Sequence, residues 1–194
     1  MSGSTARDPI FGKRFTEAVT YALHLHGEQV RKATSIPYIS HLLAVCSLVL
    51  EDGGSEDEAI AALLHDGPED QGGQATLDEI RRQFGAEVAA MVEGLSDTME
   101  HPKPPWRERK AAYLERLRDE PASVLRISLA DKLHNLRSVA TDLELVGDDL
   151  WSRFNADRDA QAWYYRALLE VFEDRIPSSR HLPEFRRLVS EVFG

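Results

Sequence analysis

The apolar residues of this 194-residue chain recur at helical spacing almost throughout, and this pattern constrains its fold more than any other feature. Phe15, Val19 and Leu23 lie on one face of a helix, and Leu114 and Leu117 repeat the spacing later in the chain. No segment shows the alternation of apolar and polar residues that is typical of a half-buried strand. The pattern therefore predicts an all-α fold.

We expect about eight to ten helices in a single domain that spans residues 1–194. The core motifs lie between residues 15 and 140, and residues 141–194 are expected to form C-terminal helices that pack on the core. The predicted helices cover residues 12–31, 39–52, 56–66, 76–84, 86–97, 106–119, 121–140, 155–175 and 183–193. A length near 200 residues is sufficient to bury one such core.

Sequence signals also predict where individual helices begin and end. Ser55 and Glu58 have the spacing of a capping box, Thr76 and Glu79 have the same spacing, and Gly85 is placed to end the helix that follows Thr76. Glycines and a proline in residues 67–73 predict a polar loop directly after the helix over residues 56–66. Three prolines in residues 101–105 predict a second break, and residues 101–110 are a candidate flap over a site.

Charge and composition exclude several functions. The formal net charge is −10, and residues 51–100 hold 14 of the 33 acidic side chains but only 2 of the 23 basic ones. Binding to nucleic acid depends on Lys and Arg at the phosphates, so no nucleic-acid partner is expected. The longest apolar run, residues 42–50, is too short for a membrane span, which needs about 20 residues. The single cysteine, Cys46, excludes an internal disulfide framework and is compatible with a reducing cytosol, so we expect a cytoplasmic protein.

A cluster of acids and histidine follows an apolar helix. His65 and Asp66 come at its end, and Glu69 and Asp70 lie within the next four residues. These groups would repel and desolvate one another at an apolar helix end unless a cation were present, so the segment predicts a metal site. Farther along the chain, Asp131 and Asn135 share one helix face at i, i+4.

These segments together resemble the HD-domain phosphohydrolases. The likeness is greatest to the (p)ppGpp hydrolase domain of RelA/SpoT homologues and to the small stand-alone alarmone hydrolases, among them the metazoan SpoT homologues. The matching pieces occur in family order and are Arg31-Lys32, Pro37-Tyr38-Ile39-Ser40-His41, Ala62-Leu63-Leu64-His65-Asp66 with Glu69-Asp70, Phe84-Gly85-Ala86-Glu87-Val88, and Leu129-Ala130-Asp131-Lys132-Leu133-His134-Asn135-Leu136. The resemblance implies an HD-domain helical bundle.

The resemblance also implies roles for single residues. His41, His65, Asp66 and Asp131 would hold one divalent ion, usually Mn²⁺ in this family, and two imidazoles with two carboxylates would equally suit Fe, Co or Zn. Glu69 and Asp70 match the acidic pair that positions and deprotonates the attacking water. The candidate substrate contacts are Arg31, Lys32, Lys132, Asn135, Ser138, Lys103 and Arg107.

Some of these residues also have simpler explanations. Arg31 and Lys32 could end the first helix favourably against its dipole. Lys103 and Arg107 belong to a basic stretch that could be a solvated face. An aromatic group, Trp163, Tyr164 and Tyr165, is typical of helix packing, although one of the rings could stack on a base. The other histidines are not expected to bind metal, and Cys46 is expected in the core.

The activity implied by the resemblance is a Mn-dependent 3′-pyrophosphohydrolase of (p)ppGpp or (p)ppApp, releasing pyrophosphate and a nucleoside di- or triphosphate. Two alternatives stay open. One is another HD phosphohydrolase, such as a nucleotidase or a phosphatase acting on the 2′-phosphate of NADPH. The other is a nucleotide-binding module with a silent site. The sequence leaves the base, the metal and the oligomeric state open, a homodimer included.

Overall fold

The chain folds into helices joined by short loops, with no extended strand in the described residues. The computed structural model describes residues 11–98 and 102–194. The elements in these ranges are α1 (Lys13–His26), α2 (Ile39–Glu51), α3 (Glu56–Leu64), α4 (Gly67–Asp70), α5 (Gln74–Phe84), α6 (Ala86–Leu95), α7 (Trp106–Leu117), α8 (Ala122–Val146), the 3-10 helix η1 (Gly147–Arg153), α9 (Arg158–Arg175) and α10 (Leu182–Phe193). The predicted all-α fold is confirmed.

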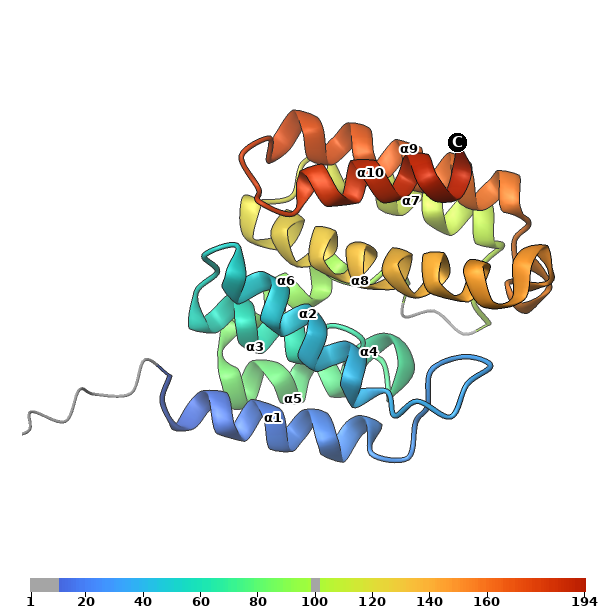
Figure 1. Ribbon diagram of the computed structural model, residues 1–194. Helices are drawn as coiled ribbons and strands as arrows, with labels where there is room; N and C mark the ends of the chain where they lie inside the picture. Colours follow the sequence, from blue (N-terminus) through green and yellow to red (C-terminus); the bar gives the residue numbers. More distant parts are fainter. Residues whose placement is uncertain (1–10, 99–101) are drawn as a thin grey trace, which may run out of the picture.

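Helix α8 lies between the N-terminal and the C-terminal helices (Figure 1). It contacts α2, α3 and α6 on one side and α9, α10 and η1 on the other. Leu125, Leu129 and Leu133 of α8 are at most 1% exposed, because the helix is covered from both sides. This position carries Asp131 to the place where α8 meets α2 and α3. None of the described helices is long and apolar enough to cross a membrane.

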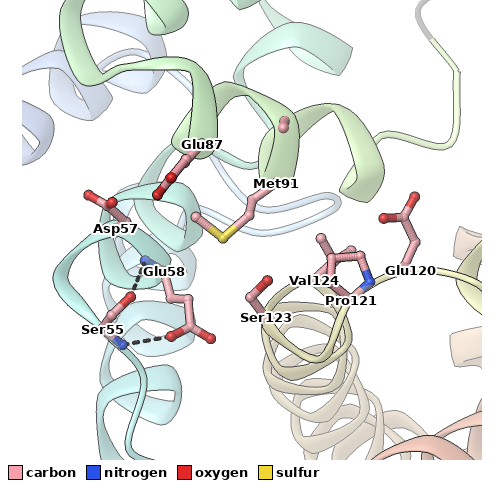
Figure 2. A pocket seen from close by; sticks show the side chains of 10 residues that line it. Ser55, Asp57, Glu58, Glu87, Met91, Glu120, Pro121, Ser123 and Val124 are labelled. Atoms are coloured by element: carbon pink, nitrogen blue, oxygen red, sulfur yellow. Dashed lines mark hydrogen bonds between the residues drawn. The ribbon is translucent and has the colours of Figure 1, made fainter.

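The capping box predicted before α3 is present. The Ser55 hydroxyl accepts a hydrogen bond from the Glu58 backbone N–H at 3.3 Å, and the Glu58 carboxylate accepts one from the Ser55 N–H at 2.7 Å (Figure 2). Gly85 ends α5 as predicted, with a φ of 99° that suits glycine. The sequence predicted these two helix ends correctly because each depends only on hydrogen bonds between residues a few positions apart.

We expect Ser55→Ala to lower the free energy of unfolding by about 1 kcal/mol, because the first turn of α3 loses one partner for its free N–H groups. Urea unfolding followed by circular dichroism measures this change. Ser47→Ala is the matched control, since Ser47 is exposed and bonds only the side chain of Glu51 in its own helix. Equal effects of the two substitutions would show that the cap does not stabilise α3.

The second predicted capping box is wrong. Helix α5 begins at Gln74, two residues before Thr76, and its N-cap is Gly73. Gly72 and Gly73 have positive φ values of 108° and 59°, so the chain turns into the helix at the glycines. The Thr76 hydroxyl instead donates a hydrogen bond to the carbonyl oxygen of Gln71.

The first helix is shorter than predicted. It ends at His26, and residues 27–38 form a loop. This loop is closed by hydrogen bonds from the Arg31 N–H to the Ile36 carbonyl oxygen at 2.8 Å and from the Tyr38 N–H to the Gln29 carbonyl oxygen at 2.9 Å. Arg31 and Lys32 therefore lie on a loop, and a role in ending the first helix is excluded.

Other boundaries also differ from the prediction, and the 3-10 helix η1 was not predicted. The expected loop over residues 67–73 contains the one-turn helix α4, because proline is tolerated in a first helical turn. Helix α8 runs beyond residue 140 to Val146, where Gly147 ends it with a φ of 61°. Residue 101 of the candidate flap lies outside the described residues, and residues 102–105 precede α7.

Candidate active site

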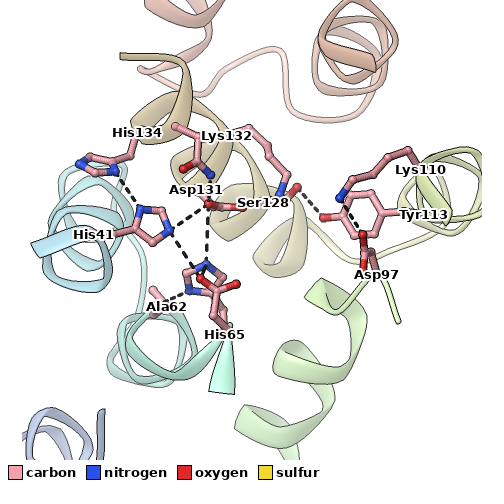
Figure 3. Close-up of polar contacts among 12 residues, drawn as sticks. His41, Ala62, His65, Asp97, Lys110, Tyr113, Ser128, Asp131, Lys132 and His134 are labelled. Atoms are coloured by element: carbon pink, nitrogen blue, oxygen red, sulfur yellow. Dashed lines mark hydrogen bonds and ion pairs between the residues drawn. The ribbon is translucent and has the colours of Figure 1, made fainter. Parts of the chain in front are cut away.

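The four predicted ligand side chains meet in the structure, and Figure 3 shows three of them, His41, His65 and Asp131, close together. His41 comes from α2, His65 and Asp66 follow α3, and Asp131 comes from α8. Ligand atoms of His41, His65 and Asp66 all lie within 4.8 Å of one another. The Oδ1 atom of Asp131 lies 3.2 Å from Nε2 of His41 and 3.7 Å from Nε2 of His65. Both imidazoles and Asp131 are buried, so the cluster is closed on the protein side.

The hydrogen bonds of His65 leave one ring nitrogen for a cation. Its Nδ1 lies 2.8 Å from the Ala62 carbonyl oxygen, and because a carbonyl can only accept, this nitrogen carries a proton. The buried Nε2 makes no hydrogen bond among the described residues, although Oδ2 of Asp66 lies 3.1 Å away. Burial opposes a charge on His65, but Asp66 and Asp131 raise its pKa well above the ordinary value. The cluster therefore attracts a positive charge at this position.

The spacing of the four groups fits a bound metal ion. Oδ2 of Asp66 lies 3.6 Å from Nε2 of His41, so the four separations between imidazole nitrogens and carboxylate oxygens run from 3.1 to 3.7 Å. Bonds of about 2.1 Å from a metal to nitrogen and oxygen would place neighbouring ligand atoms roughly 3.0 to 3.4 Å apart. The separations of 3.1 and 3.2 Å lie in this range, and those of 3.6 and 3.7 Å are slightly longer, so small side-chain shifts would let these residues hold a divalent ion.

Neighbouring side chains orient the cluster. The Tyr38 hydroxyl donates to Oδ2 of Asp66 at 2.6 Å, and Nδ1 of His134 lies 2.8 Å from Nδ1 of His41. Burial and the neighbouring His41 lower the pKa of His134 to about 4, so this imidazole is neutral at pH 7. A neutral His134 can accept the Nδ1 proton of His41, which leaves Nε2 of His41 free to face Asp66 and Asp131.

The acidic pair of the sequence motif lies on α4, directly after the cluster. The Lys103 ammonium contacts Oε1 of Glu69 at 2.9 Å. Burial and the negative charge of Asp97 raise the pKa of Glu69, and Lys103 opposes this rise. Asp70 is exposed and accepts a hydrogen bond from the Gln29 amide at 2.9 Å. A raised pKa makes this half-buried carboxylate a stronger base than an ordinary glutamate, which suits the removal of a proton from water.

A groove of about 720 Å³ lies beside the cluster and holds most of the predicted substrate contacts. Arg31 donates to Oδ1 of Asn135 at 2.8 Å and lies 3.5 Å from the Ser138 hydroxyl. The amide of Asn135 donates to Oδ1 of Asp131 at 2.6 Å, so this residue links the groove to the cluster. The predicted residues that line the groove are Arg31, Lys32, Asn135 and Ser138.

The other three predicted substrate contacts do not line the groove, and each is paired with another side chain. The ammonium of Lys132 pairs with Asp131, and that of Lys103 pairs with Glu69. The Arg107 guanidinium lies over the ring of Trp163, 3.6 Å from its centroid. Of the aromatic group in α9, Tyr164 and Tyr165 are both buried, and only Tyr165 of the two lines the groove. The structure thus brings four of the seven predicted contacts to the groove.

Four residues that surround the site were not assigned a role from sequence. They are Gln29, Tyr38, Asp97 and His134. Tyr38 and His134 belong to the quoted motifs, so their positions three residues from His41 and from Asp131 were available as signals. Asp97 is buried and pairs with Lys110 at 2.7 Å, and no local pattern in the sequence marks it.

A second groove, of about 500 Å³, lies between α3, α6 and the start of α8 (Figure 2). Asp57, Glu58, Glu87 and Glu120 line it, and none of its lining residues is basic. An acidic lining does not suit a phosphate-bearing ligand. The groove beside the histidine cluster is therefore the candidate substrate site.

The chain is similar to several known proteins. Mouse guanosine-3′,5′-bis(diphosphate) 3′-pyrophosphohydrolase MESH1 is 38% identical over 126 residues, which cover 63% of this chain and 68% of the mouse protein. The human protein of the same name is 33% identical over 171 residues, covering 87% of this chain and 88% of the relative. A solved structure described as a metazoan ortholog of SpoT that hydrolyzes ppGpp has a TM-score of 0.71 at 24% identity and covers 97% of each chain, which supports the fold.

A family model described as "HD domain" matches residues 18–161. This range contains the cluster, α4 and most of the groove. The family implies a divalent-metal site, in agreement with the group formed by His41, His65 and Asp66. The match covers well over half of the chain, and the chain therefore belongs to the HD-domain family.

Proposed function

We propose that this protein is a metal-dependent 3′-pyrophosphohydrolase of guanosine or adenosine alarmones. It would convert (p)ppGpp or (p)ppApp to a nucleoside di- or triphosphate and pyrophosphate. Two features beside the histidine and aspartate cluster carry the proposal. Glu69 lies on α4, three residues after Asp66, and Tyr38 and His134, which contact the cluster, line a groove together with Arg31 and Lys32. The human relative, which is named for this reaction and covers most of the chain, supports the substrate class.

In this proposal His41, His65, Asp66 and Asp131 hold one divalent ion, and Mn²⁺ is the ion we infer. The ion would lower the pKa of a water molecule and polarise a phosphoryl oxygen. Tyr38 would keep Asp66 oriented through its 2.6 Å hydrogen bond, and His134 would keep His41 in the tautomer whose Nε2 is free.

Glu69 and Asp70 are the proposed proton acceptors. A water molecule would attack the phosphorus atom attached to the ribose 3′ oxygen, lose one proton to Glu69, and break the bond from that phosphorus to the 3′ oxygen. The 3′ oxygen would leave as the ribose hydroxyl by taking up a proton from solvent, and Glu69 would return its own proton to solvent, so the carboxylate is restored. Lys103 lies 2.9 Å from Oε1 of Glu69. It would either keep this ion pair or break it to bind a phosphate of the substrate. Pyrophosphate is then the second product.

The groove would bind the nucleotide. Arg31 and Lys32 supply positive charge on the loop after α1, where the phosphates of the substrate require it. Asn135 and Ser138 present hydrogen-bonding groups from α8, and Tyr165 lines the same groove. These cations offset the acidic surface of residues 51–100, which would otherwise slow the capture of a polyanion.

We expect His134→Phe to weaken Mn²⁺ affinity by roughly 10- to 100-fold, because His41 loses the acceptor that fixes its tautomer. Isothermal titration with Mn²⁺ measures the dissociation constant without any need for turnover. His24→Phe is the control, because His24 is an exposed histidine of α1. An unchanged affinity in His134→Phe would remove this residue from the support of the metal site.

A substrate panel distinguishes the proposal from its alternatives. Purified protein with Mn²⁺ is incubated with ppGpp, ppApp, NADPH and common nucleotides, and pyrophosphate and orthophosphate are measured separately. Pyrophosphate from ppGpp or ppApp supports the proposal. Orthophosphate alone, from a nucleotide or from NADPH, would favour another HD phosphohydrolase, and binding without turnover in any metal would favour a silent nucleotide-binding module.

A further inference from the structure

The acidic pair is carried by a very short element. Helix α4 has four residues, and Glu69 and Asp70 form its last half. A single turn has little intrinsic stability, so contacts with other elements must hold its side chains in place. Gly67 and Pro68 are buried and anchor the start of the turn, but Asp70 is exposed. Its carboxylate therefore needs a partner outside α4 to keep one orientation.

Gln29 is that partner. Its Nε2 group donates to Oδ2 of Asp70 at 2.9 Å. Its Oε1 atom accepts from Nε2 of Gln71 at 3.0 Å and lies 2.7 Å from Nδ1 of His26. The amide thus connects the end of α1 and the following loop to Asp70, the last residue of α4, and to Gln71 directly after it.

These contacts determine which end of the amide faces Asp70. If the side chain were flipped, its oxygen would face a carboxylate and its NH₂ group would face the NH₂ group of Gln71, so two hydrogen bonds would be lost. His26 is 1% exposed and its ring stacks on Tyr38 at a centroid distance of 5.2 Å, which holds Nδ1 toward Gln29. The backbone of Gln29 is held as well, since its carbonyl accepts from the Tyr38 N–H at 2.9 Å.

We propose that Gln29 is a positioning residue for Asp70, which it holds by Oδ2 so that Oδ1 is the oxygen that faces the reacting water. This inference rests on the proposed hydrolase function, within which Asp70 acts on water. Gln29 does not contact the metal ligands through its side chain in this arrangement, so its loss should affect kcat and leave metal binding intact. A residue that only stabilised the fold would not show that separation.

The test is a double-mutant cycle of Gln29→Met and Asp70→Ala in the full chain. Methionine keeps the length of the side chain and removes its hydrogen bonds. We expect Gln29→Met to lower kcat for ppGpp on the order of 10- to 100-fold, with KM and Mn²⁺ affinity changed less than about threefold, and to have no further effect in the Asp70→Ala background. The matched control is Gln74→Met, which breaks a 3.0 Å bond of the same type to Asp78 on the exposed surface of α5.

The outcomes separate this proposal from the function on which it rests. If the wild type hydrolyses ppGpp and Gln29→Met has the same kcat, or lowers kcat equally in the Asp70→Ala background, the positioning role is overturned. If the wild type releases no pyrophosphate from any alarmone, the proposed function fails. The stability of the same four proteins, wild type, both single variants and the double variant, is then measured by urea unfolding. Additive shifts of the unfolding midpoints would then overturn the contact between Gln29 and Asp70, and non-additive shifts would support it.

Discussion

Glu69→Gln is expected to reduce kcat for ppGpp by roughly 10²- to 10⁴-fold while the protein keeps its bound metal. The amide has the shape of the carboxylate but cannot take a proton from water, and this range is typical for the loss of a general base. Glu69 is not part of the metal-binding group formed by His41, His65 and Asp66, so the metal content should stay at the wild-type level. Initial rates of pyrophosphate release and elemental analysis of the purified variant provide the two measurements.

The pH dependence of kcat provides a second test of Glu69 as the general base. Burial and the negative charge of Asp97 raise the pKa of Glu69 above the ordinary value of a carboxyl group. A general base works only when it is deprotonated, so kcat should be constant at high pH and fall as the pH drops through this raised pKa. Full activity in Glu69→Gln, or a rate that falls only at the pH of an ordinary carboxyl group, would remove Glu69 from the mechanism.

Asp131→Ala is expected to lose both metal and turnover. Its Oδ1 atom lies within 3.7 Å of both imidazole nitrogens, so the substitution opens one side of the cluster. The loss of affinity for Mn²⁺ should exceed the roughly 10- to 100-fold that supporting residues such as His134 contribute. Titration of Mn²⁺ into the metal-free variant measures the affinity, and the pyrophosphate assay measures turnover.

Asp131→Ala also leaves the half-buried Lys132 without its carboxylate partner. Removing one member of a buried ion pair typically costs about 3 to 5 kcal/mol, and Lys132 retains some exposure, so we expect a smaller loss of stability. Asp131→Asn is the companion variant, because it keeps the shape of the side chain and one oxygen. A folded Asp131→Asn protein with wild-type affinity for Mn²⁺ would contradict the role of Asp131 as a ligand.

The sequence predicted the helical class, and it singled out four side chains that the structure brings together. His65 and Asp66 are adjacent in the chain, so one local pattern marked both, whereas His41 and Asp131 were joined to them only by the resemblance to the HD-domain phosphohydrolases. Ser55 and Gly85 marked helix ends through local patterns as well. The contacts of Tyr38 and His134 depend on how α2, α3 and α8 pack together, and no local pattern contains that information.

The loop after α1 was the main failure at the site. Apolar spacing ends near His26, but the predicted helix continues to residue 31, which left the end of that helix as an alternative role for Arg31 and Lys32. The loop forms because backbone groups of Gln29 and Arg31 pair with Tyr38 and Ile36, which are far enough along the chain that residue-by-residue propensity does not detect them. Gln29, which contacts Asp70 across 41 positions in sequence, was missed with it.

The most direct test of the proposed function is the stoichiometry of the products from ppGpp. Purified protein is incubated with ppGpp and Mn²⁺, with a metal-free sample as control, and GDP, pyrophosphate and orthophosphate are measured as the reaction proceeds. We predict that GDP and pyrophosphate accumulate in equal amounts in the sample with Mn²⁺ and that neither forms in the metal-free sample. Release of neither product from ppGpp or ppApp, or of orthophosphate in place of pyrophosphate, would contradict the account.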